Sequence, residues 1–543
     1  MAWIICYSRA VDEDSLQSSG QQSCSKLSGS APGSSTVPLR DQPDAHCGGT
    51  LKSRLYTLSS GPAFLPLAGA TCILALIAYF PALQLGFLAD DYDLLHSAAS
   101  TPLATTLAPS STEIFYRPVG KVLTWWVGWH LWGYNPFLFH LESLLLHAAA
   151  SVALALWLAR TTGNLLFATL AALLFVVFPA PLEAVVWVAD QWDILASLFL
   201  FLSLWLFVTW WARKDRPLLY CCAIALYVLA IFSKESAVFL LPMYGVSIWA
   251  AKGLTNRRTV GILAAAMLPF VLAAGLNILV RLWMWGTLGG YGSRREPDLA
   301  TLMAVLSGQL RPLLAPLSPQ SFDPTVIFVV QAMTALLLVV GLVRYHRRES
   351  RLLLLLGAWL LLATVQQFAL DFPRVAFQFS RYLYIIVPAY CGLLAVLLCH
   401  SWSDMRRWKQ GYAALSLVVL LFGAIAVSWT HLATWQLVAG QVKSIEGDLG
   451  RIMPVNLDRA SGATLYVEDL PSESHGIFML QTAIGSMWYF NSGQNVTVAS
   501  VDSLSATVPR PGDKAAYGLR FAPSGDGYKV DCFQWQGHWR ACR

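Results

Sequence analysis

The sequence predicts a mostly α-helical, polytopic membrane protein with about eleven transmembrane helices and a small C-terminal β-rich domain. Apolar residues make up 56% of the 543 residues, whereas Asp, Glu, Lys and Arg together make up only 13%. Soluble domains contain roughly 25% charged residues, so this chain has too few polar side chains to cover a globule in water. Many mostly apolar runs are also long enough to cross a ~30 Å hydrocarbon core as helices.

Eleven apolar runs are predicted to span the membrane. They occupy 64–86, 137–159, 165–182, 193–212, 217–232, 236–251, 259–281, 325–344, 352–370, 382–400 and 411–431. The stretch 299–316 contains Gln309, Arg311 and two prolines, which favours a re-entrant or interfacial helix. Residues 1–60 are rich in Ser, Gly and Gln without a sustained apolar period, so we expect a disordered cytoplasmic tail before a transmembrane domain at 61–435.

Lysine and arginine predict the orientation, because cytoplasmic loops are enriched in these residues. With the N-terminus inside, the cytoplasmic loops hold 14 basic residues in 34 positions, and the opposite loops hold 8 in 118. The sequence therefore predicts a cytoplasmic N-terminus, a long first outer loop at 87–136 and an extracytoplasmic C-terminus.

The segment 440–543 has a different composition and is predicted to form the extracytoplasmic β-rich domain. Short alternating runs at 464–467 and 496–498, separated by Gly, Ser and Pro, are typical of half-buried strands. The last residues predict a hairpin that turns near Gly537, and Cys532 and Cys542 are a candidate disulfide in an oxidising compartment.

Ionisable residues at the ends of the predicted spans gather on the outer side. An ionisable side chain inside a membrane costs free energy, so its presence there indicates a function. They are Asp90, Asp91, Asp93, His140, Glu142, His147, Glu183, Asp190, Asp193, Lys234, Glu235, Arg281, Asp371 and Arg381. His140 and His147 are nearly two helical turns apart and share a face. This layout favours a pocket open to the outer leaflet, whereas transporters more often place such groups near the midplane.

Each of these residues also has an ordinary structural interpretation. A carboxylate or lysine at a loop end is usually solvated, and His147 could be a packing histidine bonded to a neighbouring helix. The basic residues form short clusters and no stripe, which argues against nucleic-acid binding, and the cysteines lack metal-ligand spacing. A lipid or oligosaccharide transporter and a non-catalytic membrane scaffold remain alternatives to an enzyme.

Several short motifs resemble one superfamily. The acidic pair Asp90-Asp91 after the first span resembles the first-outer-loop signature of GT-C glycosyltransferases, which use polyprenyl-phosphate-linked sugars. Tyr116-Arg117-Pro118, Gly133 to Pro136, and His140 to His147 are similar to a narrower branch, the cadherin-targeting transmembrane O-mannosyltransferases and related bacterial membrane proteins. Further similarities lie at 178–185 with Asp193, at 233–235 and at 381–384, although Ser143, Phe178 and Gln191 replace the branch's usual Asn, His and Arg.

The resemblance implies transfer of a hexose from a polyprenyl-phosphate donor to a hydroxyl of a protein or glycan on the extracytoplasmic side. Asp90 or Asp91 would be the catalytic base, and the pair could hold a divalent ion such as Mg²⁺ or Mn²⁺. Candidates for binding the donor phosphate are Arg117, Lys234, Arg381, His140 and His147, and candidates for an acceptor or structural role are Glu142, Glu183, Asp193, Glu235 and Tyr382. The expected location is a bacterial inner membrane, with the endoplasmic reticulum membrane as the alternative.

Overall fold

The computed structural model describes residues 64–111, 115–253, 256–287, 299–319, 321–365, 380–403, 407–452, 463–480, 483–510, 513, 515–525 and 527–542. The predicted tail at 1–60 and Asp371 lie outside the described residues.

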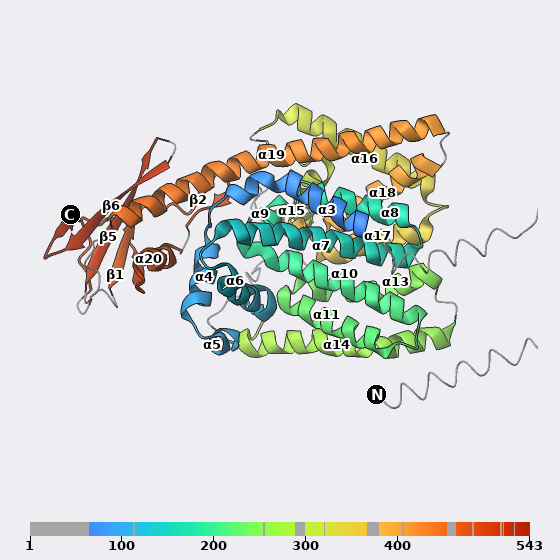
Figure 1. Ribbon diagram of the computed structural model, residues 1–543, viewed down its shortest axis with the longest axis horizontal. Helices are drawn as coiled ribbons and strands as arrows, with labels where there is room; N and C mark the ends of the chain where they lie inside the picture. Colours follow the sequence, from blue (N-terminus) through green and yellow to red (C-terminus); the bar gives the residue numbers. More distant parts are fainter. Residues whose placement is uncertain are drawn as a thin grey trace, which may run out of the picture.

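Most of the described chain is a bundle of helices with the strands at one end (Figure 1). In chain order the helical elements are α3 (Phe64–Tyr79), η1 (Phe80–Gln84), α4 (Asp90–Ser100), α5 (Leu103–Leu107), η2 (Pro118–Leu123), α6 (Thr124–Trp132), α7 (Pro136–Thr162), α8 (Leu165–Val177), α9 (Leu182–Val186), η3 (Val188–Asp190), α10 (Gln191–Ala212), α11 (Pro217–Ser233), α12 (Ser236–Phe239), α13 (Met243–Lys252), α14 (Arg257–Trp285), α15 (Leu299–Leu314), α16 (Pro324–Tyr345), α17 (Ser350–Val365), η5 (Ser380–Leu383), α18 (Val387–Ser403), α19 (Arg407–Ile452) and α20 (Ile484–Ser492).

The chain is a multi-pass membrane protein. Within the described residues, six helical stretches are long and apolar enough to cross a membrane: Leu65–Gln84, Pro136–Thr162, Val188–Ala212, Arg257–Trp285, Pro324–Tyr345 and Ala414–Ile452. Four shorter apolar helices lie at Leu165–Val177, Pro217–Ser233, Ser350–Val365 and Val387–Cys399. The predicted span 236–251 is divided into α12 and α13 beside Pro242, because proline has no N–H to donate within a helix.

Local signals explain several helix boundaries. The side chains of Asn135, Asn164 and Asn256 each accept a hydrogen bond from a backbone N–H in the first turn of α7, α8 and α14 respectively. Such caps satisfy donors that the helix itself leaves unpaired. At the other end of α7, Gly163 adopts a left-handed conformation with φ of 71°, which glycine tolerates without a Cβ clash.

Helix α19 differs from the prediction, because it runs without a break through residues 435–440, where the sequence placed the end of the membrane domain. Its 46 residues give a length of about 69 Å. Leu432, Val438, Val442, Ile445 and Leu449 are all fully buried along one side. This apolar stripe continues into the polar part of the helix and packs the helix against the C-terminal domain. The change in composition therefore marks no helix end.

A five-stranded mixed sheet, in the order β4-β1-β5-β6-β7, forms the C-terminal domain, which we call the outer domain after its predicted side. Its strands are β1 (Thr464–Glu468), β4 (Thr497–Ser500), β5 (Ala516–Ser524), β6 (Gly527–Trp535) and β7 (Trp539–Ala541), and β2 (Glu473–Ser474) pairs separately with β3 (Ile477–Phe478). Strand β1 is parallel to β4 and β5, and the remaining pairs are antiparallel. The β6–β7 hairpin turns at Gly537 with a φ of 80°, and a disulfide joins Cys532 to Cys542.

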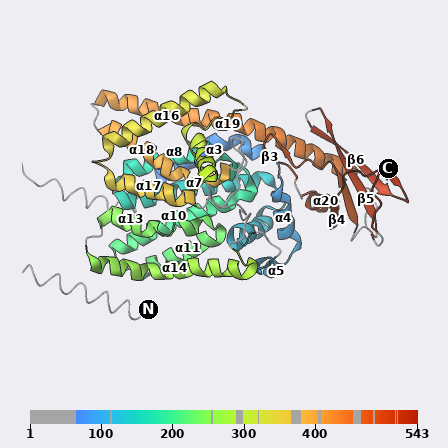
Figure 2. The ribbon, with the colours of Figure 1, turned by 180° about the vertical axis from the view of Figure 1, so that it is seen from behind.

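The sheet lies at the same end of the bundle as α4, α5 and α6, as Figures 1 and 2 show from opposite sides. Helix α19 reaches β6 from the membrane part, and α20 packs against α4. Leu88, Ala89 and Leu95 share one continuous apolar core with Met479, Leu480 and Met487. The first outer loop and the sheet domain are therefore joined by buried contacts.

Removal of the disulfide should destabilise the outer domain. The bond closes a loop with a sequence separation of 10, and constraint of the unfolded chain over such a loop is worth about 2–3 kcal/mol. We expect the double variant Cys532→Ser/Cys542→Ser to lose free energy of unfolding of this size, measured by pulse proteolysis of the full chain in urea. Equal protease resistance of the two proteins would contradict the expectation.

Candidate functional site

The acidic pair begins α4, directly beyond the first apolar helix. Asp91 is buried, and its two carboxylate oxygens accept hydrogen bonds from the backbone N–H groups of Leu88 (2.9 Å) and Ala189 (2.6 Å). Asp90 is only partly buried, and within the described part of the chain its carboxylate makes no hydrogen bond. The two neighbours therefore differ: Asp91 fixes the backbone, and Asp90 remains available to a ligand.

The environment of Asp90 makes its carboxyl group more basic than an ordinary aspartate. Burial raises the pKa of Asp90, and the nearby negative charges of Asp93 and Asp190 raise it further, while Arg381 and Lys121 oppose the increase. Burial also raises the pKa of Asp91, against the effect of its two backbone donors. A carboxylate with a raised pKa is better suited to accept a proton near neutral pH.

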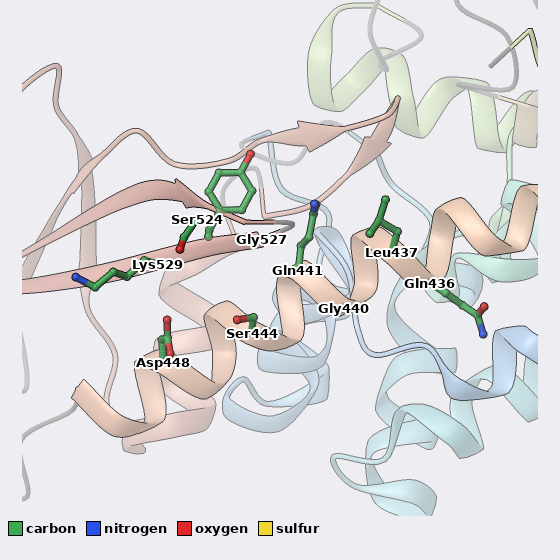
Figure 3. A pocket seen from close by; sticks show the side chains of 10 residues that line it. Gln436, Leu437, Gly440, Gln441, Ser444, Asp448, Ser524, Gly527 and Lys529 are labelled. Atoms are coloured by element: carbon green, nitrogen blue, oxygen red, sulfur yellow. The ribbon is translucent and has the colours of Figure 1, made fainter. Parts of the chain in front are cut away.

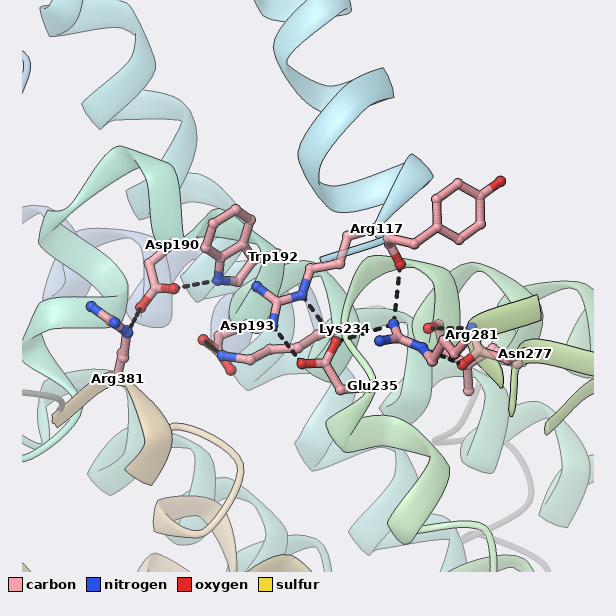
Figure 4. A network of polar contacts seen from close by, with 11 residues as sticks. Arg117, Asp190, Trp192, Asp193, Lys234, Glu235, Asn277, Arg281 and Arg381 are labelled. Carbon is pink, nitrogen blue, oxygen red and sulfur yellow. Dashed lines mark hydrogen bonds and ion pairs between the residues drawn. The ribbon is translucent and has the colours of Figure 1, made fainter. Parts of the chain in front are cut away.

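Behind the acidic pair, side chains from several helices form a network of buried charges (Figure 4). Arg117, just before η2, donates from Nε (3.0 Å) and Nη2 to the two carboxylate oxygens of Glu235. Arg281 of α14 donates to the same carboxylate (3.3 Å) and to the backbone oxygen of Tyr116 (3.0 Å). One carboxylate thus joins two guanidinium groups from segments far apart in the sequence.

Lys234 and Asp193 form a second ion pair in this network, and both side chains are almost fully buried. The turn that holds Lys234 packs closely against η2 at Gly120. A Cβ added at Gly120 would lie 2.7 Å from both the backbone oxygen of Ser233 and the Cβ of Trp192. Only glycine fits this contact, which lets Arg117 and Lys234 enter one network.

Arg381 of η5 forms the third group of ion pairs. Its Nη1 donates to Glu183 (3.0 Å), its backbone N–H donates to the same carboxylate (3.1 Å), and its Nε lies 3.8 Å from Asp190. The guanidinium lies over the rings of Trp187 (4.9 Å) and Tyr382 (5.1 Å). Burial alone would lower the pKa of Arg381, but Glu183 and Asp190 raise it above its ordinary value.

The cations of the network are therefore matched by carboxylates. Arg117 and Arg281 face Glu235, Lys234 faces Asp193, and Arg381 faces Glu183 and Asp190. Burial alone would raise the pKa of Glu235, but the Arg117 guanidinium and the other nearby cations hold it well below its usual range. The sequence predicted Arg117, Lys234 and Arg381 as phosphate ligands without predicting that each would already have an acidic partner.

The histidines and Glu142 lie apart from these ion pairs. The ring nitrogens of His147 bond to the Tyr384 hydroxyl (2.7 Å) and to the backbone oxygen of Val176 (3.2 Å). This geometry fits the packing histidine that the sequence left open, and both nitrogens are already engaged. His140 is buried two turns nearer the outer end of α7, and Glu142 accepts a hydrogen bond from Trp132 Nε1 (2.9 Å).

Two of the departures from the family pattern contact each other. Gln191 Nε2 donates to Ser143 Oγ (2.7 Å) and to the backbone oxygen of Phe139 (3.2 Å), and Gln191 and Ser143 are buried. The glutamine and the serine thus connect α7 and α10 by a hydrogen bond between uncharged side chains. The two replacements therefore form one local arrangement.

The sequence missed the roles of Asp190, Arg281 and Lys121 in the charge network. Asp190 is fully buried and accepts from Trp192 Nε1 while it faces Arg381. Lys121 is one turn after Arg117 and acts electrostatically on Asp90. Their positions next to predicted motifs were the available signal, but the sequence could not show that η2 and η3 both pack against α4 and α10.

The divalent ion expected at the acidic pair stays a prediction. Each carboxylate oxygen of Asp91 already accepts one backbone N–H bond. Among the described residues, no group of three or more His, Cys, Asp and Glu side chains has the placement of a metal site. We therefore assign no step to a metal.

An open groove lies outside the charge network, between α19 and the β5–β6 hairpin (Figure 3). Gln441, Ser444, Asp448, Tyr528 and Lys529 are among the residues that line it. None of the residues of the buried ion pairs lines it, so this groove is separate from the candidate site.

Substitution of Asp91 should affect stability more than substitution of Asp90. In Asp91→Asn the amide offers one acceptor oxygen, so one buried backbone N–H loses its partner at a cost of about 1–3 kcal/mol. We expect a lower thermal unfolding temperature for Asp91→Asn and little change for Asp90→Asn, measured by intrinsic fluorescence of the purified full chain. Unchanged unfolding of Asp91→Asn would contradict its structural role.

No protein-family model and no curated protein matches the chain. Similar solved structures include the archaeal oligosaccharyltransferase AglB from Archaeoglobus fulgidus with an inhibitory peptide and a dolichol-phosphate, at 10% identity, a TM-score of 0.47 and coverage of 80% of this chain and 64% of that one. A structure of the Archaeoglobus fulgidus oligosaccharyltransferase with Zn and sulfate is 10% identical, with a TM-score of 0.46 and coverage of 79% of this chain and 62% of that one. ArnT from Cupriavidus metallidurans bound to undecaprenyl phosphate is 13% identical, with a TM-score of 0.45 and coverage of 85% of this chain and 94% of that one. The chain thus spans less than two thirds of the oligosaccharyltransferase.

Proposed function

We propose that this protein is a membrane glycosyltransferase that moves a sugar from a polyprenyl-phosphate donor to an acceptor hydroxyl. The main support is the placement of Asp90, a partly exposed carboxylate with a raised pKa at the start of α4, where Arg381 and Lys121 act on it electrostatically. A lipid-borne donor would arrive at this boundary from the membrane, and an acceptor would arrive from water. The motif resemblance to GT-C glycosyltransferases favours the same reaction.

In the proposed step, Asp90 accepts the proton of the acceptor hydroxyl as its oxygen attacks the anomeric carbon of the sugar. The bond from this carbon to the phosphate oxygen breaks, and its electron pair leaves with the lipid phosphate. A single displacement of this kind inverts the anomeric centre. General-base assistance by a positioned carboxylate typically contributes about 10²–10⁴-fold to such a reaction.

Arg381 and Lys121 are the proposed partners of the leaving phosphate, because they are the cations that act on Asp90. A guanidinium has five donors in a planar fork, so Arg381 can pair with a phosphate while it remains bonded to Glu183. Arg117, Lys234, Glu235 and Asp193 then serve chiefly to hold this end of the bundle together.

The orientation and substrate class also belong to the proposal. The distribution of basic residues favours an extracytoplasmic position for the acidic pair and the sheet domain, and the proposed location is a bacterial inner membrane or the endoplasmic reticulum membrane. The narrower motif similarity to O-mannosyltransferases suggests a hexose as the transferred sugar and a protein or glycan hydroxyl as the acceptor.

Loss of the base should abolish transfer without loss of protein. We expect Asp90→Asn to lower kcat by roughly 10²–10⁴-fold with polyprenyl-phosphate hexoses as donors, because the amide cannot accept the proton. Asp502→Asn, at an exposed acidic position of the outer domain, is the matched control and should keep full activity. Full transfer by Asp90→Asn at unchanged membrane abundance would exclude this base.

The pH dependence of transfer should report the raised pKa of Asp90. The base works only when ionised, so activity should fall as the pH drops through this pKa, above the ~3.9 of an ordinary aspartate. Because Lys121 lowers the pKa of Asp90, Lys121→Met should move the acid limb of kcat/KM to higher pH. Lys443→Met, on an exposed part of α19, should leave the profile unchanged. A shift to lower pH in Lys121→Met would contradict the assignment.

A further inference from the structure

A segment of the outer domain reaches the backbone next to the acidic pair. The β2–β3 hairpin turns through His475 and Gly476, both with positive φ, as expected for a tight two-residue turn. Directly after β3, the backbone oxygen of Met479 accepts a hydrogen bond from the N–H of Ala89 (2.6 Å). Met479 is in turn held by its own N–H, which donates to Ser472 (2.9 Å).

The residue held by this contact has an unusual backbone conformation. Ala89 has a φ of 44° and a ψ of −119°, a region that residues with a Cβ rarely adopt. Such conformations persist where surrounding contacts fix them, and here the fixed residue immediately precedes Asp90. The direction in which α4 begins is defined by bonds on both sides of Asp90. Ala89 bonds to Met479 on one side, and Asp91 bonds to Leu88 and Ala189 on the other.

The same segment also contacts Arg381, one of the two cations that act electrostatically on Asp90. The Phe478 ring lies 5.6 Å from the Trp187 ring, and the Arg381 guanidinium carbon is 5.8 Å from the Phe478 centroid. Trp187 Nε1 donates to the backbone oxygen of Leu88 (3.3 Å). Phe478 is therefore linked through one side chain to the backbone that presents Asp90, and it also shields Arg381.

Two additional contacts anchor the outer domain to α4 and its surroundings. Ser486 of α20 donates to Asp93 (2.5 Å) and lies 3.2 Å from His96 Nδ1. Glu446 of α19 accepts hydrogen bonds from the hydroxyl groups of Tyr134 and Tyr92. These bonds come from different elements of the outer part and converge on the first outer loop.

We infer that the segment Ile477–Leu480, the strap, positions Asp90 and Arg381 for the transfer reaction. Phe478 and Met479 are positioning residues in this role, because they act through Trp187 and Ala89. The inference rests on the proposed function for its catalytic meaning, but the positioning itself can be tested without any substrate. The outer domain is then a part of the catalytic unit.

The first test measures whether the strap controls access to position 90. Full-length Asp90→Cys in detergent is labelled with a membrane-impermeant maleimide, and the rate at this position is followed by peptide mass spectrometry. Addition of Phe478→Ala should accelerate labelling by roughly tenfold, because the local structure opens more often. Phe533→Ala is the matched control, since Phe533 is also half-buried and lies beneath an arginine, Arg520, but in the sheet. Equal rates in the Phe478→Ala and control backgrounds would overturn the inference.

The second test uses transfer kinetics. Phe478→Ala should lower kcat by roughly 10–100-fold, as expected for misplacement of catalytic groups by about 1 Å, whereas Phe478→Tyr should restore most of the rate. Phe533→Ala should keep the wild-type kcat at a comparable loss of thermal stability. If Phe478→Ala keeps the wild-type kcat while Asp90→Asn is inactive, the positioning role of the strap is contradicted and the proposed function still stands. Absence of transfer by the wild type would instead remove the proposed function, and the labelling rates would still decide the strap.

Discussion

Charge buried at the end of the bundle that carries the sheet must be neutralised where it lies, and this requirement determines how the helices meet there. Loss of one partner from a buried ion pair typically costs about 3–5 kcal/mol, because the other charge remains uncompensated. Glu235 therefore ties the segment before η2 to α14, Asp193 ties α10 to the turn after α11, and Glu183 ties α9 to η5. The network forms a platform from segments that the sequence separates widely.

Asp90 can differ from its neighbour because consecutive residues of a helix point about 100° apart. Asp91 faces the interior and accepts hydrogen bonds from two backbone donors. Asp90, in contrast, faces the partly open side. An acidic pair thus yields one residue that fixes the backbone and one that can exchange a proton. The surrounding ion pairs keep their own charges balanced, so the raised pKa of Asp90 depends on burial and on a few specific neighbours.

The sequence predicted a mostly helical, multi-pass membrane protein, because long apolar runs are a local signal. It also grouped Arg117, Lys234, Glu235 and Arg381 at one end, since membrane topology restricts where loop residues can lie. It could not predict which acid each cation meets, because this depends on side-chain packing between helices. The sequence analysis did not predict that α19 continues past residue 440, since a polar composition does not end a helix whose buried stripe continues. The contact of Phe478 with Arg381 joins residues that no sequence motif connects.

The outer domain and the first outer loop behave as one structural unit for a physical reason. Their shared core includes Leu88, Ala89, Met479 and Leu480, so water is excluded from the backbone bond between Ala89 and Met479. A hydrogen bond in such surroundings is stronger than one in water, and it is costly to leave its groups unpaired. Ala89 keeps its strained conformation only while this bond and the surrounding packing persist. A change in the fold of the sheet domain must therefore alter the geometry of the residue that follows, and that residue is Asp90.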